Sequence, residues 1–359
     1  MVKSRTEWVV DYCRYGGYHR LSKIIIGIHG LGNKPPKKIL KKWWMKSIKE
    51  GLRAIGHPRL FFRFELVYWA SFLHPEPLNP KEKFKKSPSY LKEPYVPCMD
   101  FYRKEPSRLR QKILYYLEKQ IDRIFLKDDL SIHFSSVSDL IIRRFFKDLD
   151  SYFAQTCINI DKNESLVKDV IRKQLAGIIK KHKHKNILLI GHSMGSIIAY
   201  DVLNQLVPDI KIDTFVTIGS PLGLPIIMSK IASEQKQTLI KKAKLRTPEN
   251  IVRNWYNFSD LEDKVALNYN LGDDYEENSN RIRTVDKIVF NNYEYNGRRN
   301  PHKVYGYLRT PEFSAAIYDF LTFDRNKYLV WSVDKINNWV DNALTRTKYF
   351  KSISSTTES

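Results

Sequence analysis

The stretch "NILLIGHSMGSIIAYDVLNQL", residues 186–206, decides the fold class of this chain. It opens on an uncharged aliphatic run, residues 186–190, which predicts a short buried strand. Apolar side chains then recur at helical spacing over the second half of the stretch, which predicts a helix. Ser193 therefore lies in a very short turn, where the strand and helix backbones approach closely and glycine is needed. Gly191 and Gly195 meet that need.

The pattern G-x-S-x-G between a strand and a helix is typical of a serine nucleophile. A serine hydroxyl needs a base to remove its proton, and the base needs a third group to orient it. In this architecture the acid and then the histidine follow the serine along the chain. His302 is the single histidine after Ser193, in a polar loop before a helical pattern, so we predict that it is the base.

Other segments alternate between strand and helix patterns. Runs of aliphatic, β-branched and aromatic residues predict strands over 23–30, 59–72, 212–221 (ending in a turn), 250–260 and 285–293. Helical spacing predicts helices over 37–52, 166–179 and 312–323, the last of which is expected to close the fold. The alternation predicts an α/β fold, a single domain over residues 1–359 with a mostly parallel sheet flanked by helices.

Residues 73–160 interrupt this alternation and predict a helical insertion within the domain, a lid or cap. Prolines are dense in its first part, and two amphipathic helical patterns follow at 113–125 and 140–153. Both patterns are rich in basic and aromatic residues, which suits either an anionic membrane surface or packing onto the sheet. The serine- and threonine-rich end, residues 350–359, is predicted to be a flexible tail.

An oxyanion that develops during acyl transfer needs two preorganised hydrogen-bond donors. The first expected donor is the backbone N–H of Met194, directly after the serine. The second is expected from "HGLGN", residues 29–33, whose glycines let the backbone approach a substrate closely. Within it, the N–H of Leu31 or of Gly30 is the candidate. The neighbouring histidines, His29 and His192, are interpreted as structural.

Four segments, residues 23–33, 186–206, 255–266 and 298–323, together resemble the α/β-hydrolase superfamily, specifically its lipase and esterase-like branch. "HGLGN" and "GHSMGS" are similar to bacterial lipase-like members and to the deacylases that act on lipid anchors. The resemblance implies an open, mostly parallel sheet, a Ser-Asp-His triad, no cofactor and no metal. It also implies hydrolysis of a carboxylic ester through an acyl-enzyme.

The acid of such a triad is expected just beyond the strand that ends near Phe258, where the chain offers three carboxylates. Asp263 stands two residues before Val265, which resembles the D-x-V turn in which many hydrolases of this fold place their acid. Asp263 is therefore the predicted acid. Asp260 lies nearer the strand end and is the alternative, or else caps the loop.

Composition allows predictions about the cellular location of the protein and about its binding partners. The three cysteines are far apart and predict reduced thiols. No segment has the pattern of a secretory signal, and no apolar run approaches the ~20 residues of a membrane span, so we expect a cytoplasmic protein, peripheral at most to a membrane. The net charge of +22 suits an anionic membrane surface or simply a solvated surface. The chain has no nucleic-acid-binding motif, and its oligomeric state is open.

The sequence thus predicts a serine hydrolase that cleaves carboxylic esters, with lipid or acyl esters favoured. Acyl transfer to another acceptor and thioester hydrolysis use the same three residues, so both stay open as alternatives. A third alternative, from a different class, is a membrane-associated adaptor that kept the fold without catalysis.

Overall fold

The core of the molecule is a six-stranded sheet. The computed structural model describes residues 22–98, 156–158, 164–234, 244–266 and 268–356. The strands lie in the order β10-β8-β6-β5-β1-β2 and every neighbouring pair is parallel. They are β1 (Lys23–Ile28), β2 (Phe64–Val67), β5 (Asn186–His192), β6 (Ile212–Ile218), β8 (Ile251–Ser259) and β10 (Thr284–Ile288).

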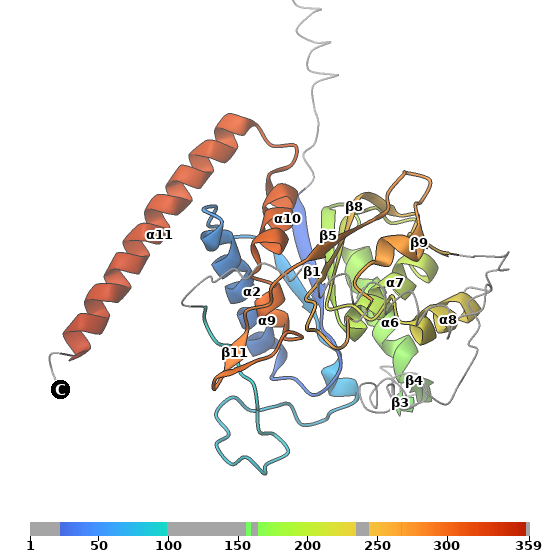
Figure 1. The fold of residues 1–359 in the computed structure, drawn as a ribbon, viewed down its shortest axis with the longest axis horizontal. Helices are drawn as coiled ribbons and strands as arrows, with labels where there is room; N and C mark the ends of the chain where they lie inside the picture. The colour runs from blue at the N-terminus through green and yellow to red at the C-terminus, as the bar shows by residue number, and fades with distance from the viewer. Residues whose placement is uncertain (1–21, 99–155, 159–163, 235–243, 267, 357–359) are drawn as a thin grey trace, which may run out of the picture.

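Helices cover both faces of the sheet (Figure 1). On one face lie α2 (Lys37–Ala54), α9 (Val304–Tyr307) and α10 (Pro311–Thr322). On the other lie α6 (Val167–Lys181), α7 (Met194–Gln205) and α8 (Pro225–Glu234). The predicted α/β class, a mostly parallel sheet flanked by helices, is confirmed.

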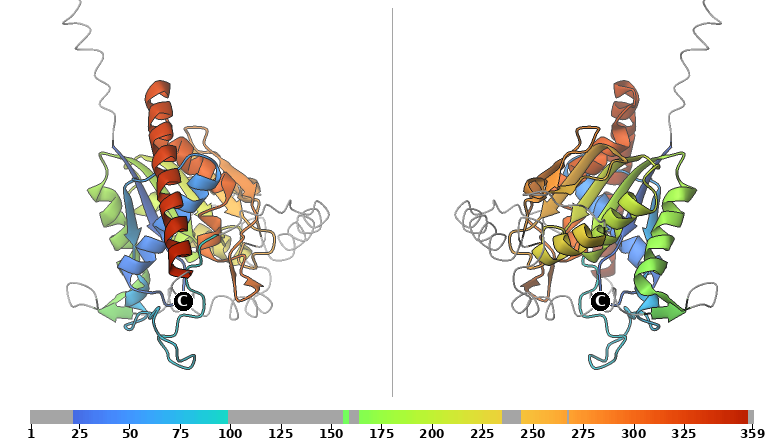
Figure 2. Two further views of the ribbon diagram at one scale, coloured as in Figure 1. Left: turned by 90° about the vertical axis from the view of Figure 1, so that its left-hand side faces the viewer. Right: turned by 90° about the vertical axis from the view of Figure 1, so that its right-hand side faces the viewer.

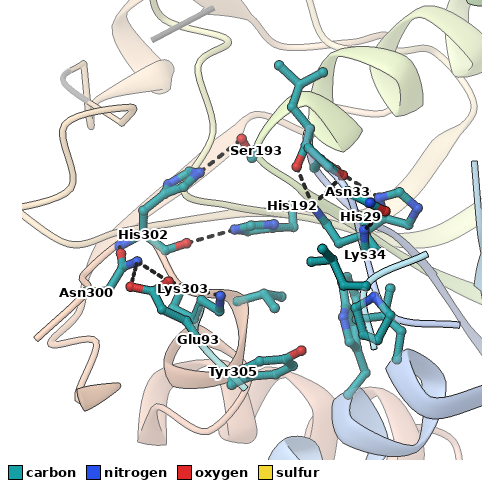
Figure 3. Close-up of a pocket in the computed structure, with 18 of the residues that line it drawn as sticks. His29, Asn33, Lys34, Glu93, His192, Ser193, Asn300, His302, Lys303 and Tyr305 are labelled. Atoms are coloured by element: carbon teal, nitrogen blue, oxygen red, sulfur yellow. Dashed lines mark hydrogen bonds and ion pairs between the residues drawn. The ribbon is translucent and has the colours of Figure 1, made fainter. Parts of the chain in front are cut away.

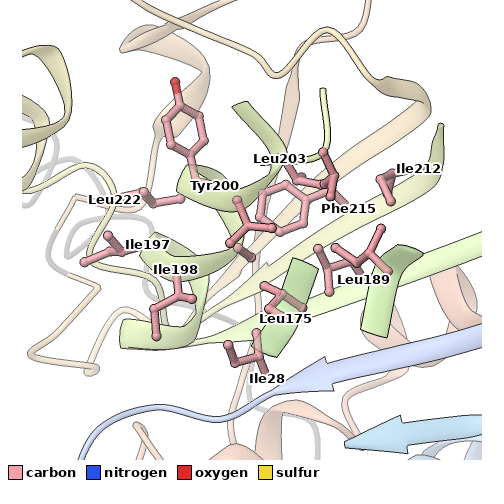
Figure 4. Close-up of a cluster of buried hydrophobic side chains, with 14 of the residues drawn as sticks. Ile28, Leu175, Leu189, Ile197, Ile198, Tyr200, Leu203, Ile212, Phe215 and Leu222 are labelled. Carbon is pink, nitrogen blue, oxygen red and sulfur yellow. The ribbon is translucent and has the colours of Figure 1, made fainter. Parts of the chain in front are cut away.

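The aliphatic run in β5 shows why the sequence folds into three layers. Ile187 and Leu189 pack into the cluster beneath α6 and α7, whereas Leu188 and Ile190 pack into the cluster beneath α2 and α10. Successive side chains of a strand point to opposite faces, so a strand covered on both sides must be apolar at every position. Figure 4 shows the α7 side of this core. Each such side chain contributes about 1.5–3 kcal/mol on burial.

Some sequence-based boundaries differ from the structure. The strand predicted over 285–293 is confined to β10, which ends at Ile288. The strand predicted over 59–72 is confined to β2, and a 3₁₀ turn, η1 (Ala70–Phe72), follows it. The backbone N–H of Trp69 donates to the side chain of His29 and is therefore not available to a neighbouring strand. The helix predicted to close the fold, α10, is followed by a longer one, α11 (Lys327–Thr356). Residues 350–356 form the end of that helix, and the flexible tail predicted over 350–359 stays a prediction.

Several shorter elements lie outside the six-stranded sheet. They are the antiparallel pairs β3 (Thr156–Ile158) with β4 (Glu164–Leu166) and β11 (Glu294–Tyr295) with β12 (Arg298–Arg299), the parallel pair β7 (Leu245–Arg246) with β9 (Tyr275–Glu276), and the turn η2 (Leu271–Asp273).

The predicted insertion is described only in part. Its start, residues 73–98, is irregular chain, and its contacts with α9 and the neighbouring loops include the ion pair of Glu93 with Lys303. The helices predicted at 113–125 and 140–153 lie outside the described residues, so a lid stays a prediction. No helix in the described ranges is both long and apolar enough to cross a bilayer.

Candidate active site

Ser193 occupies a strained turn between β5 and α7. Its φ of 54° and ψ of −127° lie in a region that costs a non-glycine residue about 1–3 kcal/mol. The flanking glycines make the turn possible. A Cβ on Gly191 would lie 2.6 Å from Cα of Ser196, and one on Gly195 would lie 2.5 Å from the carbonyl oxygen of Ile28. The sequence-based reason for these glycines, close backbone approach, is therefore confirmed.

Three side chains from distant parts of the sequence meet at this turn. The Nε2 atom of His302 lies 3.1 Å from Oγ of Ser193. The opposite ring nitrogen, Nδ1, lies 2.9 and 3.0 Å from the two carboxylate oxygens of Asp263. Because Nδ1 faces a carboxylate, it carries the proton, which leaves Nε2 free to accept from the serine hydroxyl.

The carboxylate of Asp263 is fully buried and held from several sides. The Tyr307 hydroxyl donates to Oδ2 at 2.7 Å, and the N–H of Val265 donates to Oδ1 at 2.9 Å. Burial and the neighbouring Asp263 charge raise the pKa of Tyr307 well above its usual value, so the phenol remains a donor. Gly219, with a φ of +53°, leaves room for this cluster: a Cβ there would lie 2.8 Å from Oδ2 of Asp263.

Asp260, the alternative acid, belongs to a different network. Its oxygens accept the N–H groups of Glu262 at 2.8 Å and Asn291 at 2.7 Å, and one oxygen also pairs with Arg299. Burial raises the pKa of Asp260, although these partners oppose the change. Its backbone N–H donates to the Tyr307 hydroxyl at 2.9 Å. The carboxylate that contacts His302 is therefore Asp263.

The predicted oxyanion donors lie around Ser193. Met194 is the first residue of α7, and the first amides of a helix have no partner within it. Gly30 and Leu31 both line the cavity in front of the serine. Gly30 is so close that a Cβ on it would lie 2.6 Å from Cβ of Ser193. A substrate carbonyl at the serine would thus be bordered by the backbones of α7 and of the loop after β1.

A cavity of about 420 Å³ opens beside Ser193 and His302 (Figure 3). Its far wall carries the carboxylate of Glu93, which accepts from the Asn300 amide at 2.9 and 3.0 Å and pairs with the Lys303 ammonium at 3.0 Å. Burial would raise the pKa of Glu93, but Lys303 and Asn300 hold it below its usual value. The apolar lining comprises Leu31, Pro35, Leu40, Trp44, Leu78, Leu91, Val265, Val304 and Tyr305.

The family model of the PGAP1-like alpha/beta domain matches residues 138–285. The matched range includes the turn at Ser193 and the loop that carries Asp263, within a parallel sheet flanked by helices. The chain has an α/β-hydrolase fold. His302 and residues 23–33 lie outside the matched range. A comparison with curated proteins gave no match.

The two other histidines that line the cavity, His29 and His192, are neutral, buried groups. His29 donates from Nδ1 to the Gly30 carbonyl at 2.8 Å and accepts the N–H of Trp69 at Nε2. His192 donates from Nε2 to the carbonyl of His302 at 3.0 Å, which fixes the backbone of that residue. Burial lowers the pKa of His29 to about 3, and burial together with His302 lowers the pKa of His192 well below 6.5.

Acid should weaken the fold through His29. Its pKa is depressed in the folded state, so protons bind preferentially to the unfolded chain as the pH falls below 6.5. Between pH 7 and pH 5 this costs about 2 kcal/mol of unfolding free energy. Burial raises the pKa of Asp201 to about 6, which acts in the opposite direction, so a comparison with a variant is needed.

The measurement is urea unfolding of wild type and His29→Gln at both pH values. The variant should be less stable at pH 7 but should lose about 2 kcal/mol less on acidification. Equal losses in the two proteins would contradict a neutral His29 in the folded state.

Sequence reasoning did not find several groups that shape this candidate site. Tyr307 joins the loops of Asp260 and Asp263, and no pattern around it marks that role. Gly219 ends an apolar run that predicts a strand and a turn, which was the available signal. Asn300 links Glu93 to the backbone N–H of His302, which its Oδ1 accepts at 3.0 Å. Within the described ranges, no group of three or more His, Cys, Asp or Glu side chains is arranged to hold a metal ion.

Proposed function

We propose that this chain is a serine hydrolase that cleaves carboxylic esters through a covalent acyl-enzyme, with lipid or acyl esters as its substrates. One observation carries the proposal. The hydroxyl of Ser193, the ring of His302 and the buried carboxylate of Asp263 form a continuous hydrogen-bonded chain at the edge of a cavity. Such a chain is what converts a weakly nucleophilic hydroxyl into an effective nucleophile.

In the proposed reaction, Oγ of Ser193 attacks the ester carbonyl while Nε2 of His302 takes its proton. The carbonyl oxygen becomes an oxyanion that accepts from the N–H groups of Met194 and of Leu31 or Gly30. Collapse of this intermediate expels the alcohol, which receives the proton from His302, and leaves an acyl group on Ser193. A water molecule, deprotonated by the same histidine, then attacks the acyl carbonyl. The acyl–Oγ bond breaks, the carboxylic acid leaves, and His302 returns the proton to Oγ of Ser193. Asp263 orients the imidazole and stabilises its charged form throughout.

The cavity lining favours an apolar acyl group. Leu40, Trp44 and Val304 provide hydrocarbon surface in the cavity that Ser193 also lines, and burial of such surface contributes roughly 25 cal/mol per Å². The polar cluster of Glu93, Asn300 and Lys303 lines the same cavity and suits a hydroxylated or charged part of the substrate. An ester that joins an apolar acyl chain to a polar alcohol matches both regions.

The direct test is covalent labelling of the purified full-length protein with a fluorophosphonate. Wild type should be labelled at Ser193, and Ser193→Ala and His302→Ala should not be labelled. A series of esters with increasing acyl length then ranks the substrates. An unlabelled, folded wild-type protein, tested with and without lipid vesicles, would overturn the proposal and favour an adaptor.

A further inference from the structure

Helix α11 has its polar and apolar faces reversed relative to an ordinary surface helix. It runs along the outside of the α2 and α10 layer (Figures 1 and 2). A surface helix normally turns its apolar stripe toward the core and its charges toward water. In α11, the acidic side chains face the protein, and large aromatic side chains face away from it.

The side of α11 that faces the protein is held by its two acidic residues. Asp341 accepts two hydrogen bonds from the guanidinium of Arg53, at 2.5 and 2.6 Å. Asp334 pairs with Arg59, accepts from Tyr318 at 2.8 Å and lies 3.1 Å from Nδ1 of His57. The negative charges of the described part of α11 are therefore used in its attachment.

The opposite side presents large apolar side chains. Tyr328, Trp331 and Trp339 recur at intervals that place them on one helix face together with Lys335, whose ammonium lies 4.0 Å above the Trp331 ring. Trp331 is 58% exposed and Trp339 is 73% exposed. Leu329 and Ile336 border the same face and are also exposed. Tryptophans so exposed, in one contiguous patch, mark an interaction surface.

Charge and residue type indicate what covers this face. Lys327 and Lys335 stand on α11, whose own two acids pair with the protein, and Asp324, just before the helix, pairs with Lys23. The chain as a whole carries +22, so two copies repel one another, whereas an anionic surface attracts each of them. Tryptophan and tyrosine prefer the boundary between lipid and water, and lysine next to them adds attraction to anionic headgroups.

We propose that the exposed face of α11, formed by Tyr328, Leu329, Trp331, Lys335, Ile336 and Trp339, docks on the surface of an anionic lipid bilayer. The helix lies in the plane of the interface with its aromatic side chains among the headgroups and its acidic side on the protein. This surface is separate from the cavity at Ser193, and binding can be measured without any hydrolysis.

The test is co-sedimentation of the full-length protein with vesicles of phosphatidylcholine alone or mixed with phosphatidylserine. Wild type should bind the mixed vesicles, and binding should fall as salt is raised. The double variant Trp331→Ala/Trp339→Ala should bind about tenfold more weakly or worse, and Lys335→Glu should also weaken binding. The variant Trp331→Phe/Trp339→Phe should retain most of the binding, because its rings still reach the interface.

The matched control is Phe84→Ala, which removes a 64% exposed aromatic side chain from another surface and should bind like wild type. Thermal unfolding checks that each variant is folded. Unchanged binding of the double alanine variant would overturn the proposal, as would equal binding to neutral vesicles. Failure of wild type to bind, together with self-association that needs Trp331 and Trp339, would assign the face to a second copy instead.

Discussion

Ser193→Ala and His302→Ala are each expected to lower kcat for a soluble chromogenic ester by about 10⁶-fold, and the double variant should be hardly worse than either alone. In the proposed mechanism the two groups act as one unit, since the proton that His302 would remove is the one on Oγ of Ser193, 3.1 Å away. When either side chain is removed, this proton transfer is lost, so removing the second side chain has little further effect on kcat. The residual rate should stay about 10³-fold above that in water, because the oxyanion donors and the cavity remain.

Steady-state and burst kinetics of the four proteins measure this effect. The matched controls are Ser279→Ala and His57→Ala, whose side chains bind Glu249 and Asp334, away from the cavity. Both should retain wild-type kcat. If the two active-site substitutions instead multiplied in the double variant, the residues would act independently. If Ser193→Ala kept its activity, another nucleophile would be responsible.

Asp263→Asn and Asp260→Asn are expected to separate the two neighbouring acids. Asp263→Asn should lower kcat by about 10⁴-fold, since an amide can favour the wrong tautomer of His302 and cannot stabilise its charged form. Its KM should change little, because the carboxylate is buried behind the ring, away from the substrate.

Asp260→Asn should instead act on stability. Its carboxylate accepts from two backbone N–H groups and pairs with Arg299, so its loss should cost about 2 kcal/mol of unfolding free energy while kcat stays within about tenfold of wild type. Urea unfolding of both variants measures the change in unfolding free energy, and ester hydrolysis measures the change in kcat. A larger loss of kcat in Asp260→Asn than in Asp263→Asn would reverse the assignment of the acid.

The parts of the fold that could be predicted from the sequence are those with strong local patterns. The apolar run of β5 and the helical spacing of α2, α6 and α10 place these elements within a few residues of their observed bounds. Local pattern failed where a distant contact overrides it. The strand predicted over 59–72 ends early because the backbone of Trp69 binds His29, forty residues before it in the chain.

Helix α11 was missed for a related reason. Its apolar residues face solvent and its acids face the protein, which is opposite to the pattern that identifies a core-facing helix. The inward position of the two acids is explained by their ion pairs with Arg53 and Arg59. These arginines lie far away in the sequence, so no local pattern reveals the pairing.

The sequence by itself determined the strand–turn–helix at Ser193, the parallel α/β sheet, and a short set of candidate partners for the serine. These follow from periodicity, glycine placement and residue order, which are local properties of the chain. Only the tertiary structure decided that Asp263 and not Asp260 contacts His302, that Tyr307 joins their loops, and which side chains line the cavity. These depend on side-chain directions and on contacts between distant loops, because hydrogen bonds require positions set to within a few tenths of an ångström. No local pattern of residues encodes that precision.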